Sequence, residues 1–135
     1  MTQERTARCR LEGGAGRLEL TAEAVWIGPD LLVSIWGGQR PHIGAVAAAA
    51  PRPSLADPAR TSATASVLTY LGHKEDGVAK AAAERLAAGL ETRVVVTAGM
   101  HWDGLAPEEI ARVEELAADL VARLLARLQG KKEEA

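Results

Sequence analysis

The sequence has very few ring-bearing side chains. Its 135 residues include no phenylalanine, 3 tryptophans, 1 tyrosine and 3 histidines. Alanine is far more frequent than leucine, so much of the 47% hydrophobic content consists of methyl groups that each bury little area. Small domains with such lean cores often gain burial by dimerising, and we therefore expect a homodimer.

Cysteine and net charge are also scarce. The single cysteine, Cys9, excludes an intramolecular disulfide and a multi-cysteine metal site, and suits a reducing, cytoplasmic compartment. The 16 basic and 18 acidic residues give a net charge of −2, without the positive excess of a nucleic-acid-binding protein. No run approaches the roughly 18 apolar residues of a membrane-spanning helix, and the first ten residues lack the apolar centre of a signal peptide. We therefore expect neither a nucleic-acid partner nor a membrane association.

Hydrophobic periodicity predicts two helices. Large apolar residues recur every three or four positions in Pro107–Gln129, and Pro107 suits the first helical position. A second, alanine-rich helix is expected over Glu75–Ala88, with Gly89 as its C-terminal cap.

Short apolar or alternating runs predict strands. The glycine-rich residues 13–16 predict a hairpin turn, and the proline-rich residues 51–61 predict a loop. The order of elements indicates an α+β fold, with a largely antiparallel sheet and helices packed on one side, in a single domain over residues 1–130 and a frayed tail at 131–135. The expected strands are Arg8–Glu12, Arg17–Ile27, Leu31–Trp36, Ile43–Ala50, Ala63–Tyr70 and Arg93–Ala98.

The rare rings gather in three glycine-containing segments that each follow a predicted strand. These segments are WGGQRPHIG (36–44), YLGHKEDG (70–77) and GMHWDG (99–104), and they hold all three histidines and three of the four aromatic residues. Loops at strand ends commonly carry binding groups, and the second and third segments lead toward helix N-termini, which favour anions. Cys9 and Trp26 lie outside these segments and are expected to serve packing.

The residue types in these segments suit a planar ligand with an anionic tail. Arg40 offers a planar fork for a phosphate, and the helix N-terminus after Gly72 offers free N–H groups. Trp36 or Trp102 offers a flat face for an aromatic ring system.

Each feature also has a simpler interpretation, and two other functions stay open. The glycines can be plain turns, the histidines can bond loop carbonyls, and the tryptophans can belong to the core. Three histidines from three loops can also form an open zinc site, so a small metal-dependent hydrolase using His42, His73 and His101 is the alternative. Its base would be Glu75, Asp76 or Asp103. A third possibility is a subunit that only tethers an enzyme through the helix Pro107–Gln129.

Three motifs resemble a known family. GGQRPHIG (37–44), GHKEDGVAKAAAERLA (72–87) and TAGMHWDGLAPEEI (97–110), in this order, resemble the small LpdD-type proteins associated with UbiD-type decarboxylases, which are also labelled as gallate decarboxylase subunits. The resemblance covers about Leu31 to Leu116. It implies a fold similar to that of proteasome-assembly chaperones and a dimer.

The resemblance also implies a function. It implies a non-catalytic chaperone that binds reduced prenylated flavin mononucleotide (FMN) and delivers it to a UbiD-type decarboxylase, assisting maturation of that enzyme. Matching by motif places Arg40, His42 and three glycines at the site, with His73, Lys74 and His101 close by. Together with the residues chosen for their chemistry, the expected cofactor-binding set is Trp36, Gly37, Gly38, Arg40, His42, Gly44, Gly72, His73, Lys74, His101 and Trp102.

Overall fold

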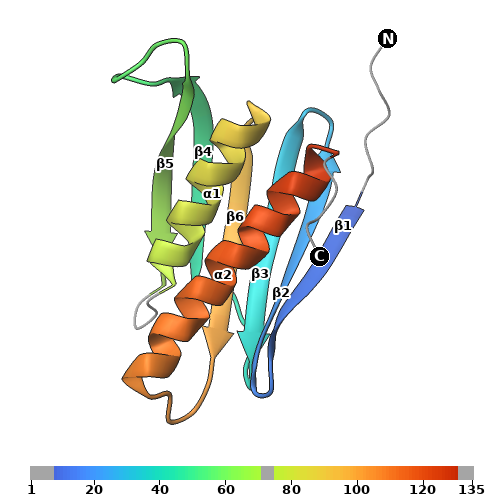
Figure 1. Ribbon diagram of the computed structural model, residues 1–135, viewed down its shortest axis with the longest axis vertical. Helices are drawn as coiled ribbons and strands as arrows, with labels where there is room; N and C mark the ends of the chain where they lie inside the picture. The colour runs from blue at the N-terminus through green and yellow to red at the C-terminus, as the bar shows by residue number, and fades with distance from the viewer. Residues whose placement is uncertain (1–7, 71–74, 131–135) are drawn as a thin grey trace.

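The computed structural model describes residues 8–70 and 75–130, which form one sheet with two helices on one of its faces (Figure 1). The six strands are arranged in the order β1-β2-β3-β6-β4-β5. β3 and β6 are parallel, and the other neighbouring strands are antiparallel. This arrangement confirms the predicted α+β class. The elements are β1 (Arg8–Ala15), β2 (Leu18–Ile27), β3 (Asp30–Gly38), β4 (Ala45–Pro53), β5 (Thr61–Thr69), α1 (Asp76–Leu90), β6 (Val94–His101) and α2 (Pro107–Leu128).

Small side chains allow the helices to lie close to the sheet. In β3, Leu31, Val33 and Ile35 are buried, whereas the residues between them are only partly buried, so alternate side chains face the helices. α1 contributes alanines such as Ala79 and Ala83, both fully buried, and packs on β4, β5 and β6. α2 packs on α1, β1 and β2. The core is therefore built mainly from alanine, valine and leucine.

The helices begin where the sequence predicts, but α1 ends differently. Gly89 is an interior residue of α1, and the left-handed residue after the helix is Glu91, with φ 52°. A Cβ at Gly89 would lie 2.8 Å from Cδ1 of Leu125 in α2. The prediction of Gly89 as a cap is therefore wrong, because this glycine provides space for the neighbouring helix. Neither helix in the described ranges is long and apolar enough to cross a membrane.

Two predicted connections are shorter than expected. β1 continues to Ala15, which leaves residues 16 and 17 as the hairpin turn. β4 continues to Pro53 and β5 begins at Thr61, so the predicted loop over residues 51–61 shrinks to residues 54–60. Cys9 is buried and Trp26 packs against the core, as predicted for structural residues. The predicted frayed tail, residues 131–135, lies outside the described residues.

The insertion of β6 between β3 and β4 brings the described parts of the three histidine segments to one end of the sheet. β3 and β6 run in parallel and therefore end together, at the bottom of Figure 1. β4 begins at that end, and both α1 and α2 also begin there. The segments 36–44 and 99–104 therefore converge, together with the described parts of the third segment, Tyr70 and residues 75–77.

The face of the sheet opposite the helices remains open. Exposed apolar side chains on this face include Ile27, Leu68 and Val95, which are 60%, 79% and 37% exposed. The surface is hollowed by about 650 Å³ over β3, β6, β4 and β5. A monomer would leave this apolar area in water.

Candidate functional site

The segment between β3 and β4 lies directly on the end of β6. Gln39 N–H donates to the carbonyl of His101 over 2.8 Å, and Gly44 N–H donates to the carbonyl of Ala98 over 2.9 Å. A Cβ on Gly99 would overlap the carbonyl oxygen of His42. Glycine at position 99 is therefore required for the backbone of residues 39–44 to cross β6 at this distance.

His42 is held between a backbone carbonyl and a buried carboxylate. Its Nδ1 donates to the carbonyl of Arg40 over 2.9 Å, and its Nε2 lies 3.0 Å from Oε1 of Glu75. The same Oε1 accepts the N–H of Met100 over 3.3 Å. Because a carbonyl only accepts, Nδ1 of His42 carries a hydrogen. His42 and Glu75 therefore form a contact pair beside the first turn of α1.

Arg40, His101 and Asp103 form a second polar cluster nearby. Nη2 of Arg40 lies 2.8 Å from Oδ1 of Asp103 and 2.8 Å from Nε2 of His101. Nε2 of His101 lies 2.9 Å from the same carboxylate oxygen. The hydrogen bond with His101, and the hydrogen bond and charge of Arg40, hold the pKa of Asp103 below its ordinary value. The Arg40 side chain is 69% exposed and faces solvent beside this cluster.

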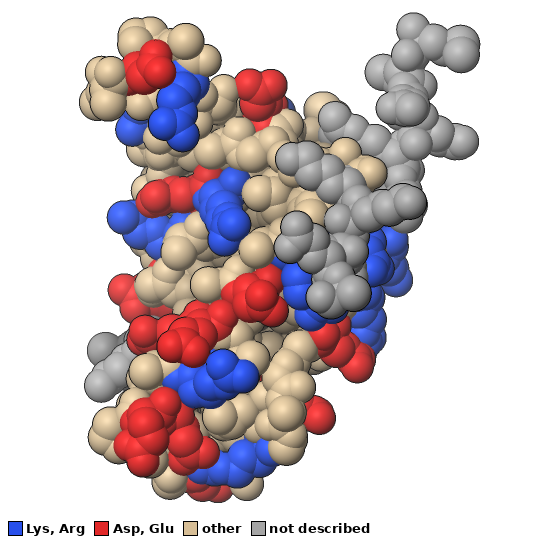
Figure 2. All heavy atoms as spheres, viewed as in Figure 1, with Lys and Arg blue, Asp and Glu red and all other residues tan. Residues whose placement is uncertain are grey.

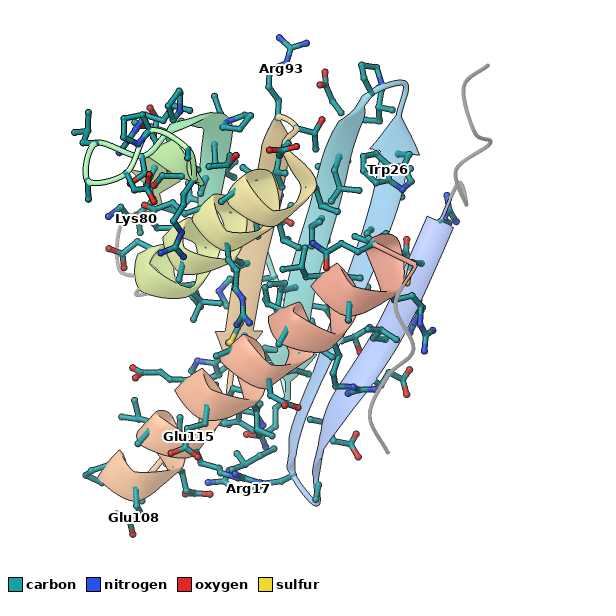
Figure 3. All side chains as sticks on the ribbon, turned by 45° about the horizontal axis from the view of Figure 1, so that its top comes forward. Arg17, Trp26, Lys80, Arg93, Glu108 and Glu115 are labelled. Carbon is teal, nitrogen blue, oxygen red and sulfur yellow. The ribbon has the colours of Figure 1, made fainter. Side chains whose placement is uncertain are left out.

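Trp102 fixes the loop that follows β6. Its ring is 5% exposed, and its indole N–H donates to the carbonyl of Arg17. The Arg17 guanidinium in turn donates to the carbonyl of Asp103 over 3.2 Å and to the carboxylate of Glu109 over 2.9 Å. In Figure 3, Arg17 lies below the first turns of α2. Trp102 therefore has mainly a packing role, in which its buried ring and its hydrogen bond to Arg17 connect β6, the β1–β2 turn and α2.

Glu109 caps the start of α2. Its carboxylate accepts the N–H of Ala106 over 3.1 Å as well as the bond from Arg17. These two interactions hold the pKa of Glu109 below its ordinary value. Ala106, before Pro107, has no side-chain oxygen to cap the helix. The carboxylate of Glu109 instead accepts the backbone N–H of Ala106.

A pocket of about 300 Å³ opens between the starts of α1 and α2 and the end of β6. This volume is at the small end of ligand pockets, which span about 300–1,000 Å³, and suits a ring system better than a whole nucleotide. Figure 2 shows acidic and basic side chains alternating over this end of the helical face. Apolar and aromatic side chains form one part of the wall and ionisable ones the other: Val78, Met100, Trp102, Leu105, Ile110 and Val113, with His42, Glu75, His101 and Glu114.

Among the described residues, the structure brings the predicted site residues together around the end of β6, with Trp36 as the exception. Arg40, His42, His101 and Trp102 lie around the end of β6. The Trp36 ring lies on the open face of the sheet, where the guanidinium carbon of Arg10 is 5.5 Å from its centroid. It does not line the pocket between the helices.

The predicted glycines have packing roles. A Cβ on Gly37 would overlap the carbonyl of Glu19, and one on Gly38, where φ is +82°, would overlap the carbonyl of His101. A Cβ on Gly44 would overlap the carboxylate of Glu75. These glycines let neighbouring strands and the His42 segment approach one another closely.

Three predicted site residues, Gly72, His73 and Lys74, lie outside the described residues. The metal alternative requires His73 beside two other histidines. Within residues 8–70 and 75–130, no group of three or more histidine, cysteine or acidic side chains is arranged to hold a metal ion.

The sequence prediction missed two carboxylates that contact the predicted site residues. Glu75 and Asp103 each lie two residues after a histidine in a segment already singled out, His73 and His101. Both were predicted only as a possible base in the metal-enzyme alternative, and Glu75 also as a residue that complements the dipole of the following helix. The spacing could have drawn attention to them, because a carboxylate near a histidine often orients it.

Comparison with known proteins agrees with the fold. A chain of the crystal structure of a chaperone complex for yeast 20S proteasome assembly superposes with a TM-score of 0.56 at 10% sequence identity, covering 93% of this chain and 98% of that chain. This confirms the expected similarity to the proteasome-assembly-chaperone fold and concerns the fold alone. No protein with a curated description matches the sequence. The family model described as the prenylated flavin chaperone LpdD-like domain matches residues 14–129, and the chain belongs to this family.

Proposed function

We propose that the protein is a non-catalytic cytoplasmic chaperone that binds reduced prenylated FMN and delivers it to a UbiD-type decarboxylase. Membership of the prenylated flavin chaperone family supports the chaperone role. The observation that carries the proposal is the pocket of about 300 Å³ with the exposed Arg40 guanidinium nearby. A pocket of the size of a ring system next to the Arg40 cation matches a flavin with a phosphate tail.

The residues present fit the two ends of such a ligand. The apolar wall of the pocket suits the ring system, and Arg40 suits the phosphate because its planar fork matches phosphate oxygens. His101 connects the two parts, since it lines the pocket and its Nε2 lies 2.8 Å from Nη2 of Arg40. The proposed site therefore consists of Arg40, His42, His101 and the edge of Trp102, with Glu75 behind His42.

The open geometry of the site suits a protein that must release its ligand. The pocket lies at the surface, and the Arg40 guanidinium is mostly exposed. Affinity from a few ring contacts and one phosphate contact is moderate, which allows transfer to a second protein.

Flavin titrations test the proposal. We expect reduced prenylated FMN to bind more tightly than FMN, and FMN more tightly than riboflavin, because each step removes a ring contact or the phosphate. Anaerobic titration by fluorescence or calorimetry measures the three affinities. In a second assay, the loaded protein mixed with an apo-decarboxylase of the UbiD type should restore decarboxylation faster than the same concentration of free cofactor. Absence of binding to reduced prenylated FMN would refute the proposal.

We also propose that a second copy of the chain covers the open face of the sheet. The middle of this face is apolar, with Leu32, Ala48 and Val95 around the hollow. Its β1–β2 side is charged, with ion pairs from Arg8 and Arg10 to Glu23. An apolar centre with a polar rim is typical of a dimer interface.

An aspartate at position 95 is expected to convert the dimer to a monomer. Val95 is partly exposed at the centre of the face, so a carboxylate there would be buried without a partner in the dimer and hydrated in the monomer. Light scattering after gel filtration should give twice the chain mass of 14.2 kDa for the unmodified protein and 14.2 kDa for Val95→Asp. Leu55→Asp, at a position 91% exposed in the loop of residues 54–60, is the control and should stay dimeric. A monomeric unmodified protein would contradict this proposal.

A further inference from the structure

The Arg40 guanidinium is already in contact with an internal anion. Its Nη2 lies 2.8 Å from Oδ1 of Asp103, and among the described residues the guanidinium makes its hydrogen bonds through Nη2 alone. The contact between Arg40 and Asp103 is therefore monodentate rather than bidentate. Both side chains are well exposed, 69% for Arg40 and 66% for Asp103, and such pairs are weak and exchangeable.

The backbone of Asp103 is fixed while its carboxylate stays accessible. Its N–H donates to Oε1 of Gln39 over 2.7 Å, and its carbonyl accepts a bond from Arg17 over 3.2 Å. Gln39 directly precedes Arg40, so these contacts hold the two loops in register. A carboxylate tethered in this way acts on Arg40 at an effective concentration on the order of millimolar or higher.

A phosphate would use Arg40 better than Asp103 does. A phosphate dianion carries more negative charge than a carboxylate and can accept two parallel N–H bonds from the guanidinium fork. Asp103 accepts only one hydrogen bond from Arg40. When a phosphate displaces Asp103, Nε2 of His101, which lies 2.9 Å from the same carboxylate oxygen, also loses that neighbour and can turn to the incoming oxygens.

We propose that Asp103 is a built-in competitor for the anion that Arg40 binds. By occupying Arg40 when no ligand is present, it lowers the affinity for phosphate-bearing ligands and returns to Arg40 as the ligand leaves. This inference rests on the proposed function for its biological meaning, because a carrier must release its cargo. The competition itself is a property of three side chains and is tested without a flavin.

The first test uses inorganic phosphate as the probe. The Nε–H resonance of Arg40 is followed by NMR during phosphate titration at constant ionic strength, since salt screens exposed charges. We expect Asp103→Asn to bind phosphate about five times more tightly than the unmodified protein, because exposed ion pairs of this kind change affinities by factors of this size. Asp103→Glu keeps the competing carboxylate and should behave like the unmodified protein.

The matched control is Asp30→Asn. Asp30 also pairs with an exposed arginine, Arg93, over 3.0 Å, but lies at the opposite end of β3. Asp30→Asn changes the net charge by the same amount as Asp103→Asn and should leave the phosphate affinity at Arg40 unchanged. An equal gain in Asp30→Asn would show a general charge effect and overturn the proposal.

The second test separates this inference from the proposed function. FMN and riboflavin differ only in the phosphate, so Asp103→Asn should bind FMN several times more tightly and riboflavin equally. Equal phosphate and FMN affinities in Asp103→Asn and the unmodified protein would overturn the competitor role and leave the flavin-carrier proposal intact. A tighter phosphate titration in Asp103→Asn without any flavin binding would support the competitor role and refute the carrier. An Arg40 resonance that does not respond to phosphate in any variant would overturn the inference.

Discussion

Gly99→Ala is expected to destabilise the protein by about 3 kcal/mol or more and to abolish flavin binding. The added Cβ would overlap the carbonyl oxygen of His42 and lie 3.0 Å from the backbone nitrogen of Gly44. Both are backbone atoms, so no side-chain rotation relieves the overlap, and inserted methyl groups in tight packing cost about 1–3 kcal/mol or more. The segment of residues 39–44 would have to leave β6, and it carries Arg40 and His42.

Urea unfolding followed by circular dichroism measures this loss. Gly77→Ala is the matched control, because Gly77 lies in the first turn of α1 with nothing within 4 Å of an added Cβ. The control should be unchanged or more stable by about 0.5–1 kcal/mol. If Gly99→Ala unfolds at the same urea concentration as the unmodified protein, residues 39–44 do not lie on β6 as described.

Arg40→Ala is expected to remove the preference for FMN over riboflavin. Hydrogen bonds to charged groups contribute about 1.5–3 kcal/mol, so the affinity for FMN should fall roughly 10- to 100-fold while riboflavin binding stays the same. Arg40→Lys should retain part of the preference, because an ammonium group contacts phosphate as a point charge. Calorimetric titration with both flavins measures the two affinities.

Arg93→Ala is the control for Arg40→Ala. Arg93 is an exposed arginine paired with an aspartate, and it directly precedes β6, whereas Arg40 contacts His101 at the end of that strand. Figure 3 shows Arg93 at the top of the molecule. Arg93→Ala should leave both flavin affinities unchanged. A loss of riboflavin binding equal to the loss of FMN binding in Arg40→Ala would indicate that Arg40 shapes the pocket rather than holding a phosphate.

The proximity of residues 36–44 and 99–104 was predictable from the sequence, but the direction of Trp36 was not. Each segment follows a predicted strand, and the strand ends in question meet at one edge of the sheet. β3 is a central strand with apolar side chains on both faces, so Leu31-Leu32-Val33 shows no alternation that would reveal which face Trp36 occupies. The pairing of β3 with β2 and β6 determines the face that Trp36 occupies. This pairing depends on residues far apart in the chain.

The error at Gly89 has a different physical origin. A glycine near the end of a helix is typically a cap, because glycine adopts positive φ without strain. Here Leu125 of α2 packs against Gly89, and Glu91 adopts the left-handed conformation instead. Helix–helix packing, which the local sequence does not show, selected glycine at this position.

The partners of the charged residues were the least predictable part of the site. Arg40 is predicted from the sequence as a cation for a phosphate, but its contact with Asp103 crosses 63 positions of sequence. His42 and Glu75 are likewise distant in the chain. Carboxylates are common in this sequence, and only the crossing of residues 39–44 over β6 selects the two that meet the histidines.

The central position of β6 also determines the order in which the protein can fold. β1, β2 and β3 form an antiparallel meander from neighbouring segments, and β4, β5 and α1 form a second local unit. Until residues 94–101 have been synthesised, β3 and β4 each expose an unpaired strand edge, and the two units have no strand between them. Parallel pairing of distant segments is slow, so insertion of β6 is expected to limit the folding rate. Because His101 and Trp102 lie at the end of that strand, the pocket is complete only in chains that have finished this step.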